Sequence, residues 1–103
     1  MTDLEMTKFA AEAMGYKVVY PNDDKLPVCI RIRRGVKSSV YNPLHIDAQA
    51  MALVKKFRLW IQSESQKFWH VHSNEDQDIY GEGTDLNRAI VECVAQSQKR
   101  EGG

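Results

Sequence analysis

The densest group of cationic residues in this chain lies between residues 31 and 37. It consists of Arg31, Arg33, Arg34 and Lys37. Arg31 and Arg33 alternate with apolar residues, and this period of two predicts that both project from one face of a β-strand. Arginine binds phosphate and carboxylate groups through two hydrogen bonds and is a common anchor at protein interfaces. The pattern therefore predicts a binding surface, although arginines on an edge strand also serve to prevent unwanted strand pairing.

Aromatic residues in a second segment could extend that surface. Trp60, Phe68 and His70 belong to two runs rich in aromatic and β-branched residues, which predict the strands of a hairpin. We expect these three side chains to lie on one face of the hairpin. If that face adjoins the arginines, the combined surface could bind a protein or stack the bases of single-stranded nucleic acid. If helices cover both faces of the sheet, Trp60 and Phe68 belong instead to the core.

Two histidines have a spacing that could serve a metal ion. His70 and His72 are two residues apart, so on a strand both side chains point to the same face. A zinc site needs three or four ligands. The candidates for the remaining ligands are His45, Asp47, Glu75 and Asp76. None of them stands at a recognised spacing from the pair, so we predict no metal site and interpret the pair as part of a partly exposed strand face.

The two cysteines offer little catalytic chemistry. Neither Cys29 nor Cys93 has a second cysteine nearby, so neither begins a zinc or redox motif. Cys93 falls on the apolar face of a predicted helix, where a free cysteine acts as a small hydrophobic residue. Cys29 could form a nucleophilic pair with His70, but no third group is present in the pattern to orient them. We therefore predict a binding module with no cofactor, and a small metal-dependent enzyme is a further alternative.

Three segments show the apolar repeat of an amphipathic helix. The first covers residues 2–14, where a threonine and a glutamate three residues later form a capping box, and Gly15 ends it. The second begins at Asn42, or at His45 as a later start, and ends in a basic turn near residue 58. The third begins after a cap at Thr84 and continues to about residue 100.

The remaining segments predict short strands. Runs of alternating or β-branched residues occur at 16–20, 28–33, 59–61 and 68–72. A polar turn at 63–66 joins the last two runs into a hairpin, whereas Gly81 and Gly83 are expected to break the chain before the last helix. This order predicts a single α+β domain over residues 1–100, with three α-helices layered on a small, mostly antiparallel sheet and a frayed tail at 101–103.

Composition limits the classes of function. The chain has 103 residues, enough for one small domain, and 14 Lys and Arg balance 14 Asp and Glu. This balance argues against a strongly basic nucleic-acid domain and against a polyacidic mimic of DNA. No apolar run is long enough to span a membrane, and the acidic N-terminal segment lacks the core of a signal peptide. We therefore expect a cytoplasmic protein that has no membrane partner.

Three short motifs resemble those of a family of small phage proteins. They are Phe9-Ala10-Ala11-Glu12-Ala13-Met14-Gly15-Tyr16, Tyr41-Asn42-Pro43-Leu44 with the helix that follows it, and Asp85-Leu86-Asn87-Arg88-Ala89-Ile90-Val91. In this order they resemble the phage ABA-sandwich family, in which a small sheet lies between layers of helices. The sequence departs from the family at His45-Ile46-Asp47, where Thr-Asp-Asp is usual.

The resemblance implies a phage or prophage origin and a sandwich-like α+β fold, but no reaction, cofactor or catalytic residue. By analogy we expect an accessory protein of the bacterial cytoplasm that binds an unidentified host or phage macromolecule. Nucleic acid is the alternative partner. A homodimer formed through an uncovered sheet face is compatible with either partner.

Overall fold

The computed structural model describes residues 2–19, 30–34, 37–74 and 78–102 of the chain. For residues 17–19, 30–34, 37–39, 64 and 100–102 it describes the backbone alone. Within these ranges the chain forms three α-helices and six β-strands, and every strand pair is antiparallel. The α+β class predicted from the sequence, with three helices and antiparallel strands, is confirmed. The first two residues of the predicted strand 28–33 lie outside the described ranges.

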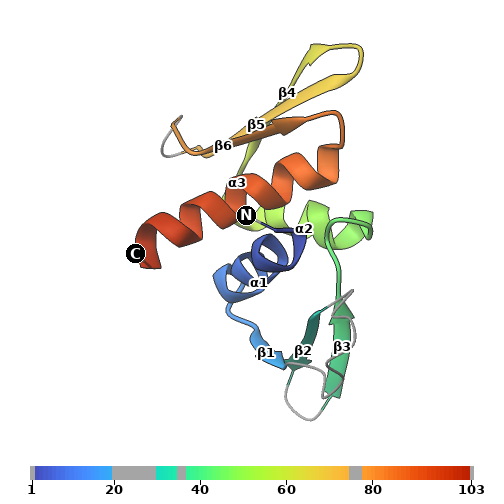
Figure 1. The fold of residues 1–103 in the computed structure, drawn as a ribbon, viewed down its shortest axis with the longest axis vertical. Helices are drawn as coiled ribbons and strands as arrows, with labels where there is room; N and C mark the ends of the chain where they lie inside the picture. The colour runs from blue at the N-terminus through green and yellow to red at the C-terminus, as the bar shows by residue number, and fades with distance from the viewer. Residues whose placement is uncertain (1, 20–29, 35–36, 75–77, 103) are drawn as a thin grey trace.

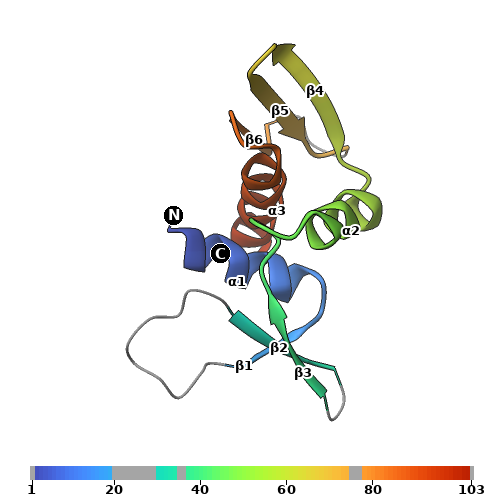
Figure 2. The ribbon, with the colours of Figure 1, turned by 90° about the vertical axis from the view of Figure 1, so that its right-hand side faces the viewer.

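The strands form two separate sheets, and the helices lie between them (Figures 1 and 2). The first sheet has the order β1 (Lys17–Val19), β2 (Ile30–Arg34), β3 (Lys37–Tyr41). The second has the order β4 (Trp60–Ser65), β5 (Phe68–His72), β6 (Tyr80–Gly83). The helices are α1 (Asp3–Ala13), α2 (Asp47–Phe57) and α3 (Leu86–Gly102). The sequence predicted one sheet. In the structure α2 connects β3 to β4, and the strands that follow α2 form a second sheet at the other end of the molecule.

Helix α1 is built as the sequence predicts. The Thr2 Oγ1 atom accepts a hydrogen bond from the backbone N–H of Glu5 at 3.1 Å. After the helix, Gly15 has a φ of 81°, in the left-handed region that glycine enters without a steric penalty. The backbone N–H of Tyr16 then donates to the carbonyl of Ala11 at 3.0 Å. This six-to-one bond completes a Schellman motif, which turns the chain sharply from α1 toward β1.

Helix α2 begins later than either predicted start. Asn42, expected to be the N-terminal cap, lies in a turn where its carbonyl accepts hydrogen bonds from the N–H groups of His45 and Ile46 at 3.1 and 2.8 Å. The side chain of Gln49 accepts from the backbone N–H of Asn42 and so fastens this turn to the helix. The helix itself starts at Asp47. The prediction failed because an Asn-Pro pair opens a tight turn as readily as it opens a helix.

The predicted hairpin of β4 and β5 is confirmed, with a shorter turn than expected. Strand β4 continues through Ser65, so the turn consists of Gln66 and Lys67 rather than residues 63–66. The pairing shifts by one residue between Ser63 and Ser65. This irregularity is a β-bulge, which takes up the additional residue and increases the local twist. Polar residues on an exposed hairpin end therefore pair as a strand even though their composition indicates a turn.

Strand β6 was not predicted, because Gly81 and Gly83 suggest a break in the chain. Gly81 is buried and pairs with Val71 of β5. A Cβ atom at Gly81 would lie 2.1 Å from the carbonyl oxygen of Ala89 and 2.9 Å from the backbone nitrogen of Cys93, both in α3. Both distances are well inside van der Waals contact, and real Cβ atoms essentially never approach a backbone atom this closely. The glycine is therefore required because the strand and helix backbones are in direct contact.

Helix α3 is the central element of the core. Its N-terminal cap is Asp85 rather than the predicted Thr84: Oδ1 of Asp85 accepts from the N–H groups of Asn87 and Arg88 at 3.1 and 3.4 Å. The helix contacts β5 and β6 on one side and α1 and α2 on the other. It continues to Gly102, beyond the predicted end. Its buried residues are Ala89, Ile90, Val91, Cys93, Val94 and Ala95.

Replacing Gly81 with alanine is expected to lower the free energy of unfolding by about 3 kcal/mol, because the new Cβ forces β6 away from α3. The control is Gly15→Ala. A Cβ at Gly15 meets nothing within 4 Å, so only the positive φ costs stability, by about 1 kcal/mol. Equilibrium unfolding in urea measures both changes. Equal losses in the two variants would contradict the close approach of β6 to α3.

Candidate functional site

The outer face of the β4–β6 sheet carries a row of rings. Alternation along β5 directs Phe68, His70 and His72 to the same face, opposite to the face that contacts α3. The pairing of the strands places Trp60 of β4 and Tyr80 of β6 on either side of His72. We call Trp60, Phe68, His70, His72 and Tyr80 the ring face.

The rings contact one another across the strands. Trp60 and His72 are stacked, with ring centroids 6.0 Å apart and planes inclined by 6°. His70 and Tyr80 are also stacked, at 5.3 Å and 20°. The His70 and His72 rings are 5.8 Å apart and connect the two pairs. Four rings thus form one continuous series, in which each contact contributes about 0.5–1.5 kcal/mol beyond the burial of apolar area.

Hydrogen bonds hold the polar atoms of these rings. The indole N–H of Trp60 donates to Oδ1 of Asn74 at 2.8 Å. Nδ1 of His72 lies 3.1 Å from the carbonyl oxygen of Ser73, and because a carbonyl can only accept, this nitrogen carries the proton. Nδ1 of His70 lies 3.4 Å from a carboxylate oxygen of Glu82. These bonds restrict the side chains to one arrangement before any partner binds.

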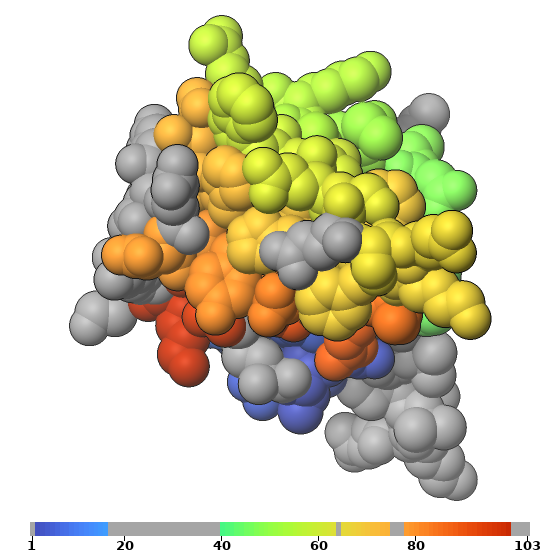
Figure 3. Space-filling model, turned by 90° about the horizontal axis from the view of Figure 1, so that it is seen from above, coloured from blue at the N-terminus to red at the C-terminus, as the bar shows by residue number. Residues whose placement is uncertain are grey.

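The ring face is exposed (Figure 3). Trp60 is 56% exposed and Tyr80 is 44% exposed, and both are among the most exposed large hydrophobic residues of the described chain. Phe68, His70 and His72 are half-buried. Trp60 therefore does not belong to the core, which settles one of the alternatives that the sequence left open. The predicted common face of Trp60, Phe68 and His70 is confirmed by the strand register.

The structure does not bring the arginines to this face. Arg31, Arg33 and Arg34 lie on β2, in the sheet at the other end of the molecule, and the helices separate the two sheets (Figures 1 and 2). Arg31 pairs with Val19 and Val40 on the neighbouring strands. The combined aromatic and cationic surface considered from the sequence is thus not formed. A separate binding role for the β2 arginines stays a prediction.

The histidine pair has no further metal ligands grouped with it among the described residues. His70 and His72 do share a face, as predicted. Among the described residues, however, no group of three or more His, Cys, Asp and Glu side chains is placed to hold a metal ion. Asp47 is instead bound at the start of α2, where its Oδ1 accepts from Nδ2 of Asn87 at 2.8 Å. Two other candidate ligands, Glu75 and Asp76, lie outside the described residues.

Cys93 is a core residue, as predicted from its place on the apolar helix face. It is fully buried in α3, and its Sγ donates to the carbonyl oxygen of Ile79 at 3.6 Å. Burial, with a smaller effect of the Glu92 carboxylate, raises the pKa of Cys93 to about 12. The thiol is therefore protonated at neutral pH and is a poor nucleophile. Cys29, the other thiol considered, lies outside the described residues.

Sequence reasoning missed Tyr80 as a member of the ring face. The alternation of Ile79, Tyr80, Gly81 and Glu82 is the signal that could have identified a strand here. The two glycines concealed it, because glycine inside a short segment suggests a turn. The sequence indicated that His72 lies on a partly exposed strand face but not that it contacts Trp60, whereas in the structure it lies between Trp60 and His70 in the row of rings.

Comparison with known proteins assigns no family or function to this chain. No family model, no curated protein and no solved structure matches the chain. Within the part of the chain that the structure describes, no helix has the length and apolar character needed to cross a membrane. The resemblance to the phage ABA-sandwich family stays a prediction.

The Cys93 thiol is expected to resist alkylation in the native protein. A rise in pKa from 9.0 to about 12 lowers the thiolate fraction at pH 8 about 1,000-fold, and only the thiolate reacts. The Cys29→Ser variant leaves Cys93 as the single thiol of the chain. Iodoacetamide labelling of this variant, followed by mass spectrometry, should be far slower in buffer than in denaturant.

The same shift predicts a pH dependence of stability. The folded state holds the thiol proton more tightly than the unfolded state, so this contribution is complete below about pH 9 and is lost as the pH rises toward 12. Cys93→Ala serves as the control, since its unfolding free energy should fall less over this pH range. Native labelling as fast as that of the unfolded chain would contradict both expectations.

Proposed function

We propose that this protein is a non-enzymatic binding module that attaches to a protein partner through the ring face. The observation that supports this proposal is the continuous row of rings on an exposed sheet face whose other side is covered by α3. Aromatic residues with polar tips supply most of the energy at protein interfaces, because they bury a large area at a small cost in side-chain entropy. Trp60 and Tyr80, the most exposed members of the row, are the expected anchors.

Charge favours a protein over nucleic acid as the partner. Proteins that bind single strands combine stacking residues with a positively charged groove. Here a carboxylate, that of Glu82, is in contact with the ring face, and the β2 arginines lie on the other sheet. The rings also stack on one another, which leaves less of their flat surface available to bases. The balance of 14 positive and 14 negative residues gives no general attraction to phosphate.

We further propose that the module is a phage or prophage accessory protein that acts on a host or phage protein in the bacterial cytoplasm. The order of the three sequence motifs supports this origin. The Met14-Gly15-Tyr16 motif forms the Schellman end of α1, and Asp85 of the third motif caps α3. These motifs therefore include residues with defined structural roles. No residue of this chain is assigned a catalytic role.

Removing the two anchors is expected to weaken partner capture at least tenfold, because truncation of a central aromatic anchor typically costs about 2 kcal/mol or more. The test compares the wild-type chain with Trp60→Ala/Tyr80→Ala in pull-downs from bacterial lysate, with and without nuclease, quantified by mass spectrometry. Met51→Ala is the matched control. Met51 is a similarly exposed hydrophobic residue, 42% accessible, but it lies on α2.

Each outcome bears on one part of the proposal. A protein captured in both nuclease arms, lost with the double variant and retained with Met51→Ala, supports the ring face. Capture that disappears with nuclease would show that the partner is nucleic acid or is held through nucleic acid. Capture that survives the double variant but fails with Arg31→Ala/Arg33→Ala moves the interface to β2. An elution mass of two chains, reduced to one in the double variant, identifies a second copy as the partner.

A further inference from the structure

A pocket of about 450 Å³ lies between the C-terminal ends of α1 and α2 and the middle of α3. Its apolar lining comes from Ala13, Phe57, Leu59, Cys93 and Val94. Of these, Cys93 and Val94 are buried and the others are half-buried. The volume falls within the range of about 300–1,000 Å³ that is typical of sites for small organic molecules. The pocket contains no residue of the ring face, but it adjoins that face through Ser73 and Asn74, which hydrogen-bond to His72 and Trp60.

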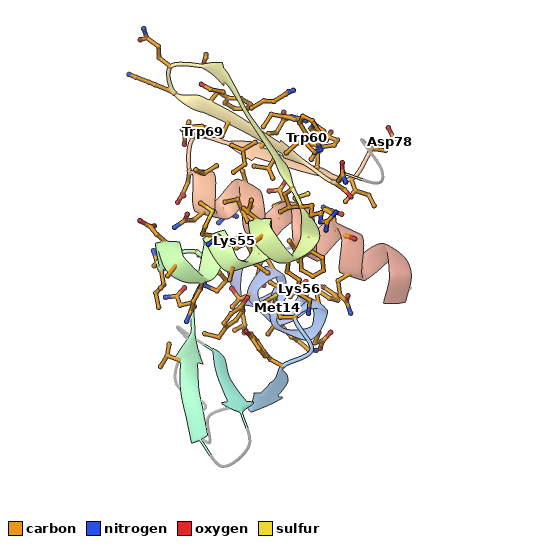
Figure 4. All side chains as sticks on the ribbon, turned by 180° about the vertical axis from the view of Figure 1, so that it is seen from behind. Met14, Lys55, Lys56, Trp60, Trp69 and Asp78 are labelled. Carbon is orange, nitrogen blue, oxygen red and sulfur yellow. The ribbon has the colours of Figure 1, made fainter. Side chains whose placement is uncertain are left out.

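The charged residues of the pocket lining are all cationic. Lys56 and Arg58 contribute positive charge, and the described lining contains no aspartate or glutamate. Nζ of Lys56 donates to the carbonyl oxygen of Met14 at 3.1 Å, which fixes the ammonium group at the end of α1 (Figure 4). The uncharged polar residues include Asn74, Ser97 and Gln98, which can donate hydrogen bonds. A mixed cavity, with an apolar wall, hydrogen-bond donors and two cations, matches a ligand that has an apolar body and one anionic group.

The backbone at Arg58 gives a second reason to assign this residue a function. Arg58 follows α2 in the left-handed conformation, with φ 51° and ψ 52°, and it is the non-glycine residue with positive φ in the described chain. Glycine is the usual residue at this position, because a Cβ is strained there. A cation near a helix C-terminus is favourable in general, but Lys55 and Lys56 already supply that charge in the last turn. The helix end therefore does not explain why an arginine occupies a position suited to glycine.

We propose that this pocket binds a small organic anion, with its apolar body against Phe57 and Val94 and its carboxylate, sulfonate or phosphate between Lys56 and Arg58. This inference does not rest on the proposed function, since its cations and apolar wall are not ring-face residues and its ligand is of a different class. The anionic group gains charge-assisted hydrogen bonds from the two cations. Burial of the body removes apolar surface of the ligand and of the pocket from water.

The test uses two fluorescent probes of similar shape that differ in charge. The first is 1-anilinonaphthalene-8-sulfonate, whose emission rises in apolar surroundings, and the second is the uncharged N-phenyl-1-naphthylamine. We expect the wild-type chain to bind the sulfonate saturably, and Lys56→Gln/Arg58→Gly to bind it about tenfold more weakly. The uncharged probe should bind both proteins with affinities within about twofold of each other, because the apolar lining is unchanged.

The control Lys55→Gln removes one cation from α2 outside the pocket lining and should leave sulfonate binding unchanged. Ser97→Trp fills the cavity and should abolish binding of both probes. Thermal unfolding shows that each variant is folded, and Arg58→Gly should melt no lower than wild type, because glycine accepts the positive φ. If that variant does not fold, Arg58→Asn replaces it, since asparagine tolerates the same conformation.

Three results would overturn the proposal. The first is the absence of saturable sulfonate binding to the wild-type chain. The second is unchanged sulfonate affinity in Lys56→Gln/Arg58→Gly. The third is loss of the sulfonate signal with Trp60→Ala/Tyr80→Ala but not with Ser97→Trp, which would place the probe on the ring face.

Discussion

The contact between Gly81 and α3 is the constraint on which the arrangement of the second sheet depends. Because Gly81 has no side chain, the backbone of β6 lies directly against the backbone of α3 at Ala89 and Cys93. The pairing of Gly81 with Val71 then brings the buried centre of β5 against the same helix. Alternation along the strands directs the neighbours of these residues outward. The ring face is thus a consequence of how closely the inner face packs.

Helix α3 connects the second sheet to α1 and α2, and it does so mainly through buried apolar side chains rather than through its surface charges. Arg88 of α3 forms an ion pair with Asp3 of α1, but both side chains are largely exposed, and such pairs contribute only about 0–1 kcal/mol. Ile90 and Val91 are each almost fully buried, and burial of one such side chain contributes about 1.5–3 kcal/mol. The apolar contacts of α3 with α1, α2 and the sheet therefore determine where the helices lie.

Local patterns predicted the three helices and four of the six described strands, and contacts distant in sequence decided what the patterns left open. The end of α1 at Gly15 and the alternation of Phe68, His70 and His72 were predictable, because each depends on residues a few positions apart. The strand that contains Gly81 was not predictable, because in the sequence a glycine that allows close packing of two backbones looks the same as a glycine in a turn. Nor could the sequence show that the β2 arginines and the ring face belong to different sheets. That division depends on how the helices pack between the sheets. The spacing of apolar residues along a single strand or helix does not show it.

The ring face also has the rigidity that an interface needs. An exposed tryptophan gains little from the fold itself, and ordering a flexible side chain on binding costs about 0.5–1.5 kcal/mol. Trp60 has already lost much of that freedom, because its ring stacks on His72 and its indole N–H is bound to Asn74. His72 is held in turn by the carbonyl of Ser73, so residues 73 and 74 hold both rings through hydrogen bonds. A partner that binds Trp60 would therefore meet a side chain whose position is largely set in advance, and less of the binding energy would be spent on ordering it.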